Sequence, residues 1–130
     1  MGKKRSLALV LDASALIAFE RADPRMRALV REALRTGCTL IVPAGVVARV
    51  WRDGARHVGL KALLSGPTTI VPALDDIFAR AAGVLCGRTG TSDVTAASVV
   101  LVARRENAAV VTRDVAALHE LDPSLTTHTI

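Results

Sequence analysis

Three aspartates lie next to apolar segments of the chain, and carboxylates in this setting can bind a catalytic metal ion. Asp12 ends the apolar run 7–11. Asp114 follows the run 109–112, and Asp93 opens the helical segment before it. Because the carboxyl ends of parallel strands meet at one edge of a sheet, we expect these carboxylates to lie near one another. Their oxygens suit Mg²⁺ or Mn²⁺, and such a metal activates water and stabilises charge on a transferred phosphoryl group.

Each aspartate also has a purely structural interpretation. Asp93 follows Ser92, and this pair is typical of a helix N-cap with an acid at the start of the helix. Asp114 could cap a helix that begins near Val115 in the same way. Asp12 could cap the helix that follows it, but a carboxylate beside an apolar run also needs a partner elsewhere in the chain. The sequence leaves both interpretations open.

Apolar runs and helical stripes predict the elements that must position these aspartates. Short continuous apolar runs, typical of strands buried on both faces, occur at 7–11, 39–42, 69–71 and 109–112, with a weaker, more polar one at 126–130. Helical segments alternate with them at 13–19, 25–35, 43–51, 56–64, from Pro72 to about Leu85, 93–105 and from Val115. This alternation predicts parallel strands joined by right-handed crossovers, and therefore a three-layer α/β/α sandwich with a central parallel sheet.

Length and composition predict a single domain, residues 1–130, with surface that other molecules cover. The chain is too short for two ordinary domains. Hydrophobic residues make up 51% of it, and its mean hydropathy of +0.38 indicates oligomerisation. The net charge is +5, with 14 arginines among 17 basic residues. This balance suits nucleic acid or an acidic partner peptide, although a solvated basic surface would also explain it.

Several classes of site lack the residues that they need. The sequence contains no glycine-rich phosphate loop, and His57, His119 and His128 do not have metal-ligand spacing. Cys38 and Cys86 show neither metal spacing nor disulfide density, which favours a reducing, cytoplasmic location. No apolar run is long enough to cross a membrane.

Four blocks of sequence carry a resemblance to a known family. In order they are LVLDASAL, VPAGVVARVWRDG, GTSDVTAASVVLVARREN and AAVVTRDVAAL, and together they extend over essentially the whole chain. They resemble the PIN-domain family, and in particular the VapC-type toxins of bacterial toxin–antitoxin pairs. The resemblance implies a PIN fold, an acidic site for Mg²⁺ or Mn²⁺, cleavage of single-stranded RNA, a homodimer and inhibition by an antitoxin protein.

The resemblance also implies roles for individual residues. Asp12, Asp93 and Asp114 match acids of the family's site, and they are therefore the expected catalytic and metal-ligating residues. Thr112 matches the threonine that supports the last of these acids. Ser14, in the first block, is a further expected supporting residue.

Other positions depart from the family's pattern. Arg49 stands where the family has a glutamate, Ala96 where it has an aspartate, and Ala117 at a position that is often acidic. Each change removes a metal ligand and a negative charge, and Mg²⁺ affinity depends on both. The arginine also brings a permanent positive charge.

Arg49 could act in two ways as a supporting residue. If it points into the site, it would pair with Asp12 or Asp114 and occupy the place of the metal. If it swings outward, it would contact RNA phosphate and leave the three aspartates to hold one metal with extra water. Arg52 and Arg56 are the expected RNA-binding residues, although solvated helix charges would also explain them.

Three functions remain open from the sequence. The first is a Mg²⁺- or Mn²⁺-dependent endoribonuclease that acts on single-stranded RNA through Asp12, Asp93 and Asp114. The second is a catalytically inactive PIN-domain homologue that acts by binding RNA, an antitoxin or another PIN subunit. The third is a small α/β domain without a role in nucleic-acid chemistry. Metal binding separates the first function from the second.

Overall fold

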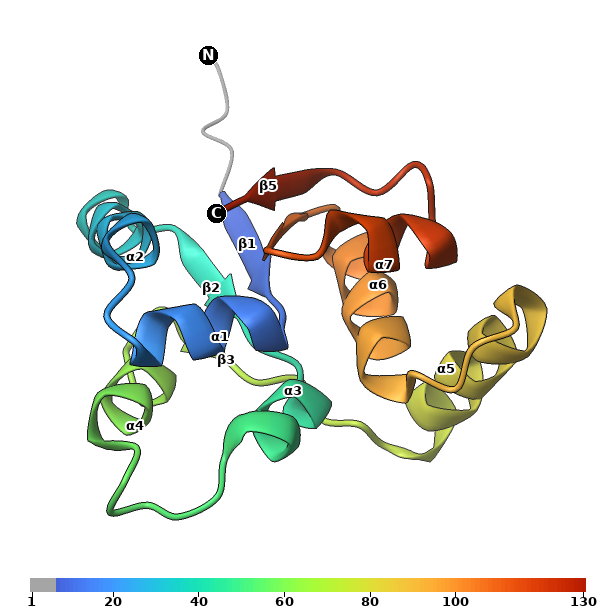
Figure 1. Cartoon of the computed structure of the whole chain (residues 1–130), viewed down its shortest axis with the longest axis horizontal. Coiled ribbons are helices and arrows are strands. Elements are labelled where there is room, and N and C mark those ends of the chain that lie inside the picture. Colours follow the sequence, from blue (N-terminus) through green and yellow to red (C-terminus); the bar gives the residue numbers. More distant parts are fainter. Residues whose placement is uncertain (1–6) are drawn as a thin grey trace.

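A computed structural model describes residues 7–130 and contains a five-stranded parallel sheet (Figure 1). Its strands are β1 (Ala8–Leu11), β2 (Thr39–Ile41), β3 (Thr69–Ile70), β4 (Ala109–Thr112) and β5 (Thr127–Thr129). They lie in the order β3-β2-β1-β4-β5, and every pairing is parallel. In the centre, Leu11 of β1 lies opposite Val111 of β4. The predicted parallel sheet is confirmed, including its polar edge strand.

Helices cover both faces of the sheet. Among the described residues they are α1 (Ala13–Glu20), α2 (Pro24–Thr36), α3 (Ala44–Val50), α4 (Val58–Leu64), α5 (Asp76–Thr89), α6 (Val94–Glu106) and α7 (Val115–Leu121). The connections from β1 through β2 to β3 run towards one edge of the sheet, whereas those from β3 through β4 to β5 run towards the other. Right-handed crossovers then place the two groups of helices on opposite faces. Figure 1 shows α1, α2 and α4 on one side of the strands and α5 to α7 on the other, which is the predicted three-layer sandwich.

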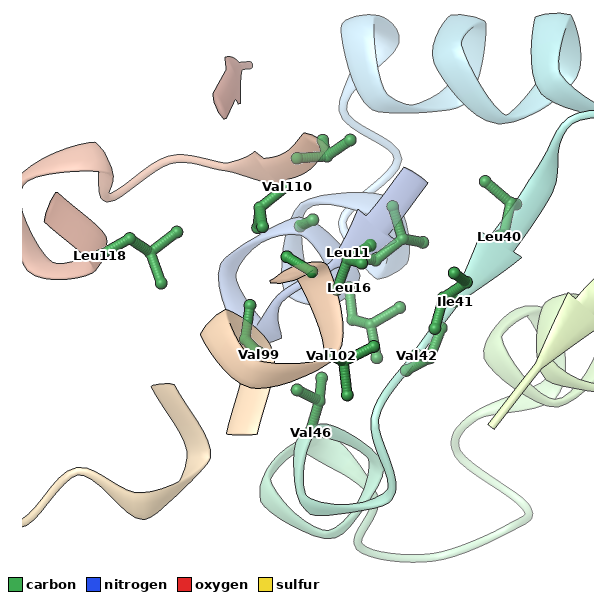
Figure 2. Packing of buried hydrophobic residues seen from close by; sticks show 14 of the residues in the cluster. Leu11, Leu16, Leu40, Ile41, Val42, Val46, Val99, Val102, Val110 and Leu118 are labelled. Carbon is green, nitrogen blue, oxygen red and sulfur yellow. The ribbon is translucent and has the colours of Figure 1, made fainter. Parts of the chain in front are cut away.

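The core lies between the sheet and both helical layers because the central strands are apolar on both faces. Val10 and Leu11 of β1 and Val110 and Val111 of β4 are fully buried. Figure 2 shows side chains of the sheet packed together with those of α1, α3 and α6. Complete burial of one such side chain stabilises the fold by about 1.5–3 kcal/mol. This packing fixes the ends of β1 and β4, where the candidate site begins.

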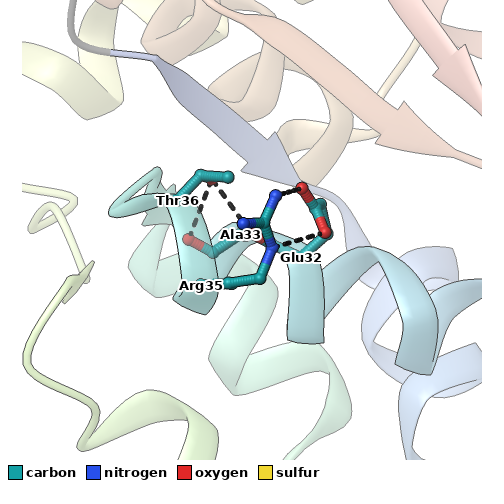
Figure 3. Close-up of polar contacts among 4 residues, drawn as sticks. All are labelled: Glu32, Ala33, Arg35 and Thr36. Atoms are coloured by element: carbon teal, nitrogen blue, oxygen red, sulfur yellow. Dashed lines mark hydrogen bonds and ion pairs between the residues drawn. The ribbon is translucent and has the colours of Figure 1, made fainter.

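Most helix ends follow capping signals that are visible in the sequence. α2 begins after Asp23, whose side chain accepts a hydrogen bond from the Met26 amide, and it ends at Gly37. Gly37 has φ 73°, a left-handed conformation that favours glycine. In the last turns of α2, Arg35 donates two hydrogen bonds to the Glu32 carboxylate (Figure 3). Those bonds lower the pKa of the Glu32 carboxyl, but both side chains are exposed, so the pair adds little stability.

Two predicted helix starts are wrong by a few residues. The helix predicted from Pro72 begins at Asp76, because Asp75 is its N-cap and accepts a hydrogen bond from the Phe78 amide at 2.9 Å. The helix predicted from residue 56 begins at Val58. The preceding residues form a turn in which the Asp53 carboxylate accepts a hydrogen bond from the Ala55 amide.

A buried aspartate anchors the connection from α7 to β5. The Asp122 carboxylate accepts hydrogen bonds from the Ser124 hydroxyl at 2.6 Å and from Nε of Arg104 at 2.9 Å. The hydrogen bond from Ser124, helped by Arg104, holds the pKa of this carboxyl below its ordinary value although burial opposes the shift.

No helix within residues 7–130 has the length and apolar character that crossing a membrane requires. The cytoplasmic location stays a prediction.

Candidate functional site

The candidate site lies where the two halves of the sheet meet. β1 and β4 are neighbours, but the chain leaves β1 towards one edge and β4 towards the other. In parallel sheets, this change of direction opens a crevice beyond the carboxyl ends of the strands, where ligands bind. Asp12 directly follows β1, and Asp114 lies two residues beyond the end of β4. The topology therefore places both aspartates at the mouth of the crevice.

A hollow of about 250 Å³ occupies this crevice. We call it the aspartate hollow, and it is lined by Asp12, Ala13, Ser14, Ile17, Arg49, Asp93, Thr95, Ala96, Val99, Asp114, Ala117 and Leu118. The three aspartates expected at the site are thus brought together from the start of α1, the start of α6 and the start of α7. Their catalytic and metal-ligating roles stay predictions.

The Asp12 carboxylate accepts hydrogen bonds from hydroxyl and amide groups. One carboxylate oxygen accepts hydrogen bonds from the Ser14 hydroxyl at 2.7 Å and from the Ala15 amide at 2.9 Å. The other accepts a hydrogen bond from the Thr112 hydroxyl at 2.6 Å. The residue is only 9% exposed, and Thr112 is completely buried. Asp12 therefore caps α1 and joins the end of β1 to the end of β4. Thr112 is the distant partner that the sequence led us to expect for this carboxylate.

The supporting hydroxyls expected from the sequence lie in this same network. The Thr112 hydroxyl accepts a hydrogen bond from the Asp114 amide at 2.8 Å, and the Ser14 hydroxyl accepts one from the Arg113 amide at 2.9 Å. Each hydroxyl thus donates to Asp12 and accepts from the backbone that follows β4. This arrangement fixes the position of the backbone at Arg113 and Asp114.

Asp93 and Asp114 both act as helix N-caps, as their structural interpretation predicts. The Asp93 carboxylate accepts a hydrogen bond from the Ala96 amide at 3.0 Å, and the Asp114 carboxylate accepts one from the Ala117 amide at 3.2 Å. These bonds hold each carboxylate over the first turn of its helix. The same geometry directs both of them towards the aspartate hollow.

Arg49 lines the aspartate hollow from α3, where its guanidinium donates a hydrogen bond to Asp93 at 3.4 Å. The sequence left two roles open, a pair with Asp12 or Asp114 and a contact with RNA phosphate, and the structure pairs the guanidinium with neither of those two aspartates. The reason is that α3 packs against α6, while both oxygens of Asp12 already accept hydrogen bonds. The two side chains are 54% and 41% exposed, so the pair is weak and can exchange partners.

The residues of the aspartate hollow do not fit a divalent metal ion. Within residues 7–130, no group of three or more acidic, histidine or cysteine side chains is placed so that it could hold a metal. Ala96 and Ala117 supply methyl groups at two of the lining positions, and Arg49 supplies a positive charge. Mg²⁺ and Mn²⁺ need several oxygen ligands with negative charge.

A second hollow, rich in arginine, adjoins the first. It measures about 290 Å³ and is lined by Ile17, Glu20, Arg21, Arg49, Val50, Arg52, Arg56 and His57. We call it the arginine hollow. It brings together Arg52 and Arg56, whose binding of RNA stays a prediction. It also contains Arg21, which sequence reasoning missed because this residue follows α1, far from the other arginines in the chain.

A buried histidine holds the arginine hollow together. His57 is 6% exposed, and its Nε2 accepts a hydrogen bond from the Arg52 amide at 3.0 Å. Its other ring nitrogen, Nδ1, contacts the Glu20 carboxylate. The Trp51 ring packs against the His57 ring at a tilt of 35°, with centroids 5.2 Å apart. The loop between α3 and α4 is therefore fastened to the end of α1, and no sequence pattern pairs Glu20 with His57.

Comparisons with known proteins find similar structures. No protein-family model and no curated protein sequence matches this chain. A chain of VapBC2 from Rickettsia felis, solved bound to a DNA fragment from the promoter, matches with a TM-score of 0.68 at 16% identity, over 95% of this chain and 99% of that one. A chain of FitAB, solved bound to an IR36 DNA fragment, matches with a TM-score of 0.62 at 13% identity, over 93% and 94% of the two chains. PAE2754 from Pyrobaculum aerophilum matches with a TM-score of 0.62 at 19% identity, over 95% and 92%.

These matches extend over nearly the whole length of each chain, so they concern the complete arrangement of the sheet and its two helical layers. At such low identities these matches show the fold alone. The chemistry of the hollows depends on this chain's own residues. The five parallel strands and the crevice between β1 and β4 agree with the fold that the four sequence blocks imply. The chain has the three-layer PIN-domain fold of VapC-like proteins.

Proposed function

We propose that this chain is a catalytically inactive PIN-domain homologue that acts by binding other molecules. One observation carries the proposal: Arg49 lines the aspartate hollow and donates a hydrogen bond to Asp93. A divalent cation in this hollow would face a guanidinium that is always protonated. Ala96 and Ala117 further replace oxygen ligands with methyl groups at positions where the resemblance expects acids.

The three remaining aspartates support this proposal because each already caps a helix. Asp12 is the clearest case, since both of its oxygens accept hydrogen bonds within the protein. A metal bound there would have to compete with the hydroxyls of Thr112 and Ser14. The aspartates are thus explained by the stability of the fold, and metal-dependent cleavage of RNA is the competing function that the experiment below tests.

The partner that we propose is a protein of the antitoxin kind. The VapC-type resemblance and the presence of VapBC2 among the structural neighbours support it. The net charge of +5 and the arginine hollow provide a surface for an acidic segment of such a partner. Single-stranded RNA is the alternative ligand, and its binding would not require a metal.

We also propose that the chain forms a homodimer through α5. Ile77 is 81% exposed and Val84 54% exposed, and they share one face of the helix with the exposed Ala81. Pairing this stripe with itself would bury it in a two-fold interface. Sedimentation equilibrium is expected to give a dimer for the wild type and a monomer for Ile77→Asp. Val58→Asp changes a valine of α4 that is 71% exposed and should leave the dimer intact; a monomeric wild type contradicts the proposal.

Metal titration tests the proposed function. Calorimetric titration of the wild-type protein with millimolar Mn²⁺ is expected to show no binding, because the hollow lacks ligands and carries Arg49. Single-stranded RNA incubated with the protein and Mn²⁺ should stay intact. Mn²⁺ binding that disappears in Asp114→Asn, together with Mn²⁺-dependent cleavage, would instead establish the endoribonuclease.

A further inference from the structure

A third hollow lies on the sheet between α2 and β5 (Figure 1). We call it the α2 hollow. It measures about 640 Å³ and is lined by Leu7, Leu9, Arg25, Ala28, Leu29, Glu32, Ala33, Thr36, Cys38, His128, Thr129 and Ile130. Room is left there because α7, which connects β4 to β5, lies on the opposite face of the sheet. The α2 hollow shares no lining residue with the aspartate hollow or the arginine hollow.

The α2 hollow is elongated, because it follows α2 from one end of the strands to the other. Asp23, the N-cap of α2, forms an ion pair with Arg113, which directly follows β4. The start of α2 therefore lies at the carboxyl ends of the strands. The Leu7 carbonyl accepts a hydrogen bond from the Thr39 amide at 3.0 Å, which places Leu7 and the end of α2 at the amino ends. The part of α2 that lines the hollow, residues 25–36, is about 17 Å long.

The middle of the α2 hollow and its end near Leu7 are apolar. Leu9 of β1 and Leu29 of α2 line the middle. Ala33 and Cys38, which are 4% and 5% exposed, line the end near Leu7. Burial raises the pKa of the Cys38 thiol, so this group is uncharged at neutral pH. This part of the hollow therefore offers an apolar surface to an aliphatic chain.

The opposite end of the α2 hollow carries Arg25 and His128. Arg25 lies in the first turn of α2, and His128 pairs with Val111 near the end of β4. Both residues are exposed, and Arg25 forms no ion pair with an acidic side chain of residues 7–130. A guanidinium is always protonated and can donate two hydrogen bonds to one carboxylate, and an imidazole N–H can donate a further one. This end therefore suits a single carboxylate.

The acids near the α2 hollow are engaged by other arginines. Glu32 lines the hollow, but its carboxylate accepts two hydrogen bonds from Arg35 (Figure 3), which lower the pKa of this carboxyl. Glu32 also lies two turns of α2 beyond Arg25, about 10 Å further along the helix. Asp23, next to the Arg25 end, is paired with Arg113. The positive charge of Arg25 is therefore available to a ligand.

We propose that the α2 hollow binds an aliphatic monocarboxylate of the fatty-acid kind, with its carboxylate on Arg25 and His128 and its chain in the apolar part of the hollow. Sites for small molecules have volumes of about 300–1,000 Å³ and combine an apolar lining with a few polar groups, as this hollow does. One positive end and a long apolar remainder match a ligand with one charge and one chain. The site is separate from the aspartate hollow and does not depend on whether that hollow binds a metal.

Calorimetric titration with dodecanoate, decanoate and octanoate tests the proposal, at concentrations too low for micelles. Dodecanoate is expected to bind, and the affinity should fall about fourfold for each methylene group removed, because each buried methylene contributes to binding. Decanol, the neutral counterpart of decanoate, should bind at least about tenfold more weakly than decanoate, because hydrogen bonds to a charged group contribute more.

Two variants with matched controls locate the ligand. Arg25→Gln should weaken dodecanoate about tenfold. Arg31→Gln, on the same helix but outside the hollow, should bind like the wild type. Ala28→Trp places an indole ring in the hollow and should abolish binding. Ala62→Trp, at an exposed position of α4, should have no effect.

Three results would overturn the proposal: no binding of dodecanoate, equal losses in Arg25→Gln and Arg31→Gln, or an affinity that does not change with chain length. Sedimentation equilibrium of Ala28→Trp tests the competing occupant of the hollow, a second copy of this chain. A dimer that is lost in Ala28→Trp, together with a wild type that does not bind dodecanoate, would assign the α2 hollow to a contact between subunits.

Discussion

The double variant Arg49→Glu/Ala96→Asp is expected to bind Mn²⁺, with an affinity at least about a hundredfold above that of the wild type. Changes around a metal site that leave its ligands in place alter affinity by about 10–100-fold, and this variant changes the donor set itself. It removes the guanidinium from the aspartate hollow and adds two carboxylates to its lining. Because Asp93 is the N-cap of α6, Ala96 is the third residue of that helix, where an acid is favourable. Calorimetric titration with Mn²⁺ measures the gain.

A matched control separates a metal site from a general increase in negative charge. Arg31→Glu/Ala28→Asp makes the same two exchanges on exposed positions of α2 and should leave Mn²⁺ binding as weak as in the wild type. The single variants should each give a smaller gain than the double variant, since ligand number and charge act together. If the double variant binds no better than the α2 control, Arg49 and Ala96 are not what prevents metal binding.

The strands and the helices could be predicted because their signals are local. The runs that contain Val10, Leu11, Val110 and Val111 are apolar on both faces, and the structure buries these residues completely. The aspartate N-caps and Gly37 mark helix ends through bonds between residues close in sequence. The order of the elements then fixed the crevice at β1 and β4, and with it the convergence of the three aspartates.

The contacts of Arg49 could not be predicted, because they depend on how helices from distant segments pack. Arg49 and Asp93 are 44 residues apart in the sequence, and they come into contact only because α3 packs against α6. The contact between Glu20 and His57 extends over 37 residues and joins the end of α1 to the loop before α4. No periodicity or spacing signals such a pair. The arginine hollow depends on the contact between Glu20 and His57. The sequence therefore predicted its residues Arg52 and Arg56 but not Arg21.

Asp12→Ala is expected to lower the free energy of unfolding by about 2–4 kcal/mol. The substitution removes the N-cap of α1, which contributes about 1 kcal/mol. It also removes the acceptor for the hydroxyls of Thr112 and Ser14, and hydrogen bonds to a charged group contribute about 1.5–3 kcal/mol. Asp93→Ala and Asp114→Ala lose a cap on a more exposed helix start and should cost about 1 kcal/mol each. Urea denaturation followed by circular dichroism measures these differences.

The sign of the Asp12 effect distinguishes the two explanations of this carboxylate. A carboxylate retained for metal binding stands near other acids, and its removal in metal-free protein relieves repulsion and raises stability. A carboxylate retained for the fold is bonded within the protein, and its removal lowers stability. Asp12→Asn keeps an oxygen that can accept from Thr112, so it should lose less than Asp12→Ala. If Asp12→Ala is as stable as the wild type or more so, the hydrogen bonds to Thr112 and Ser14 do not explain why an aspartate stands at the end of β1.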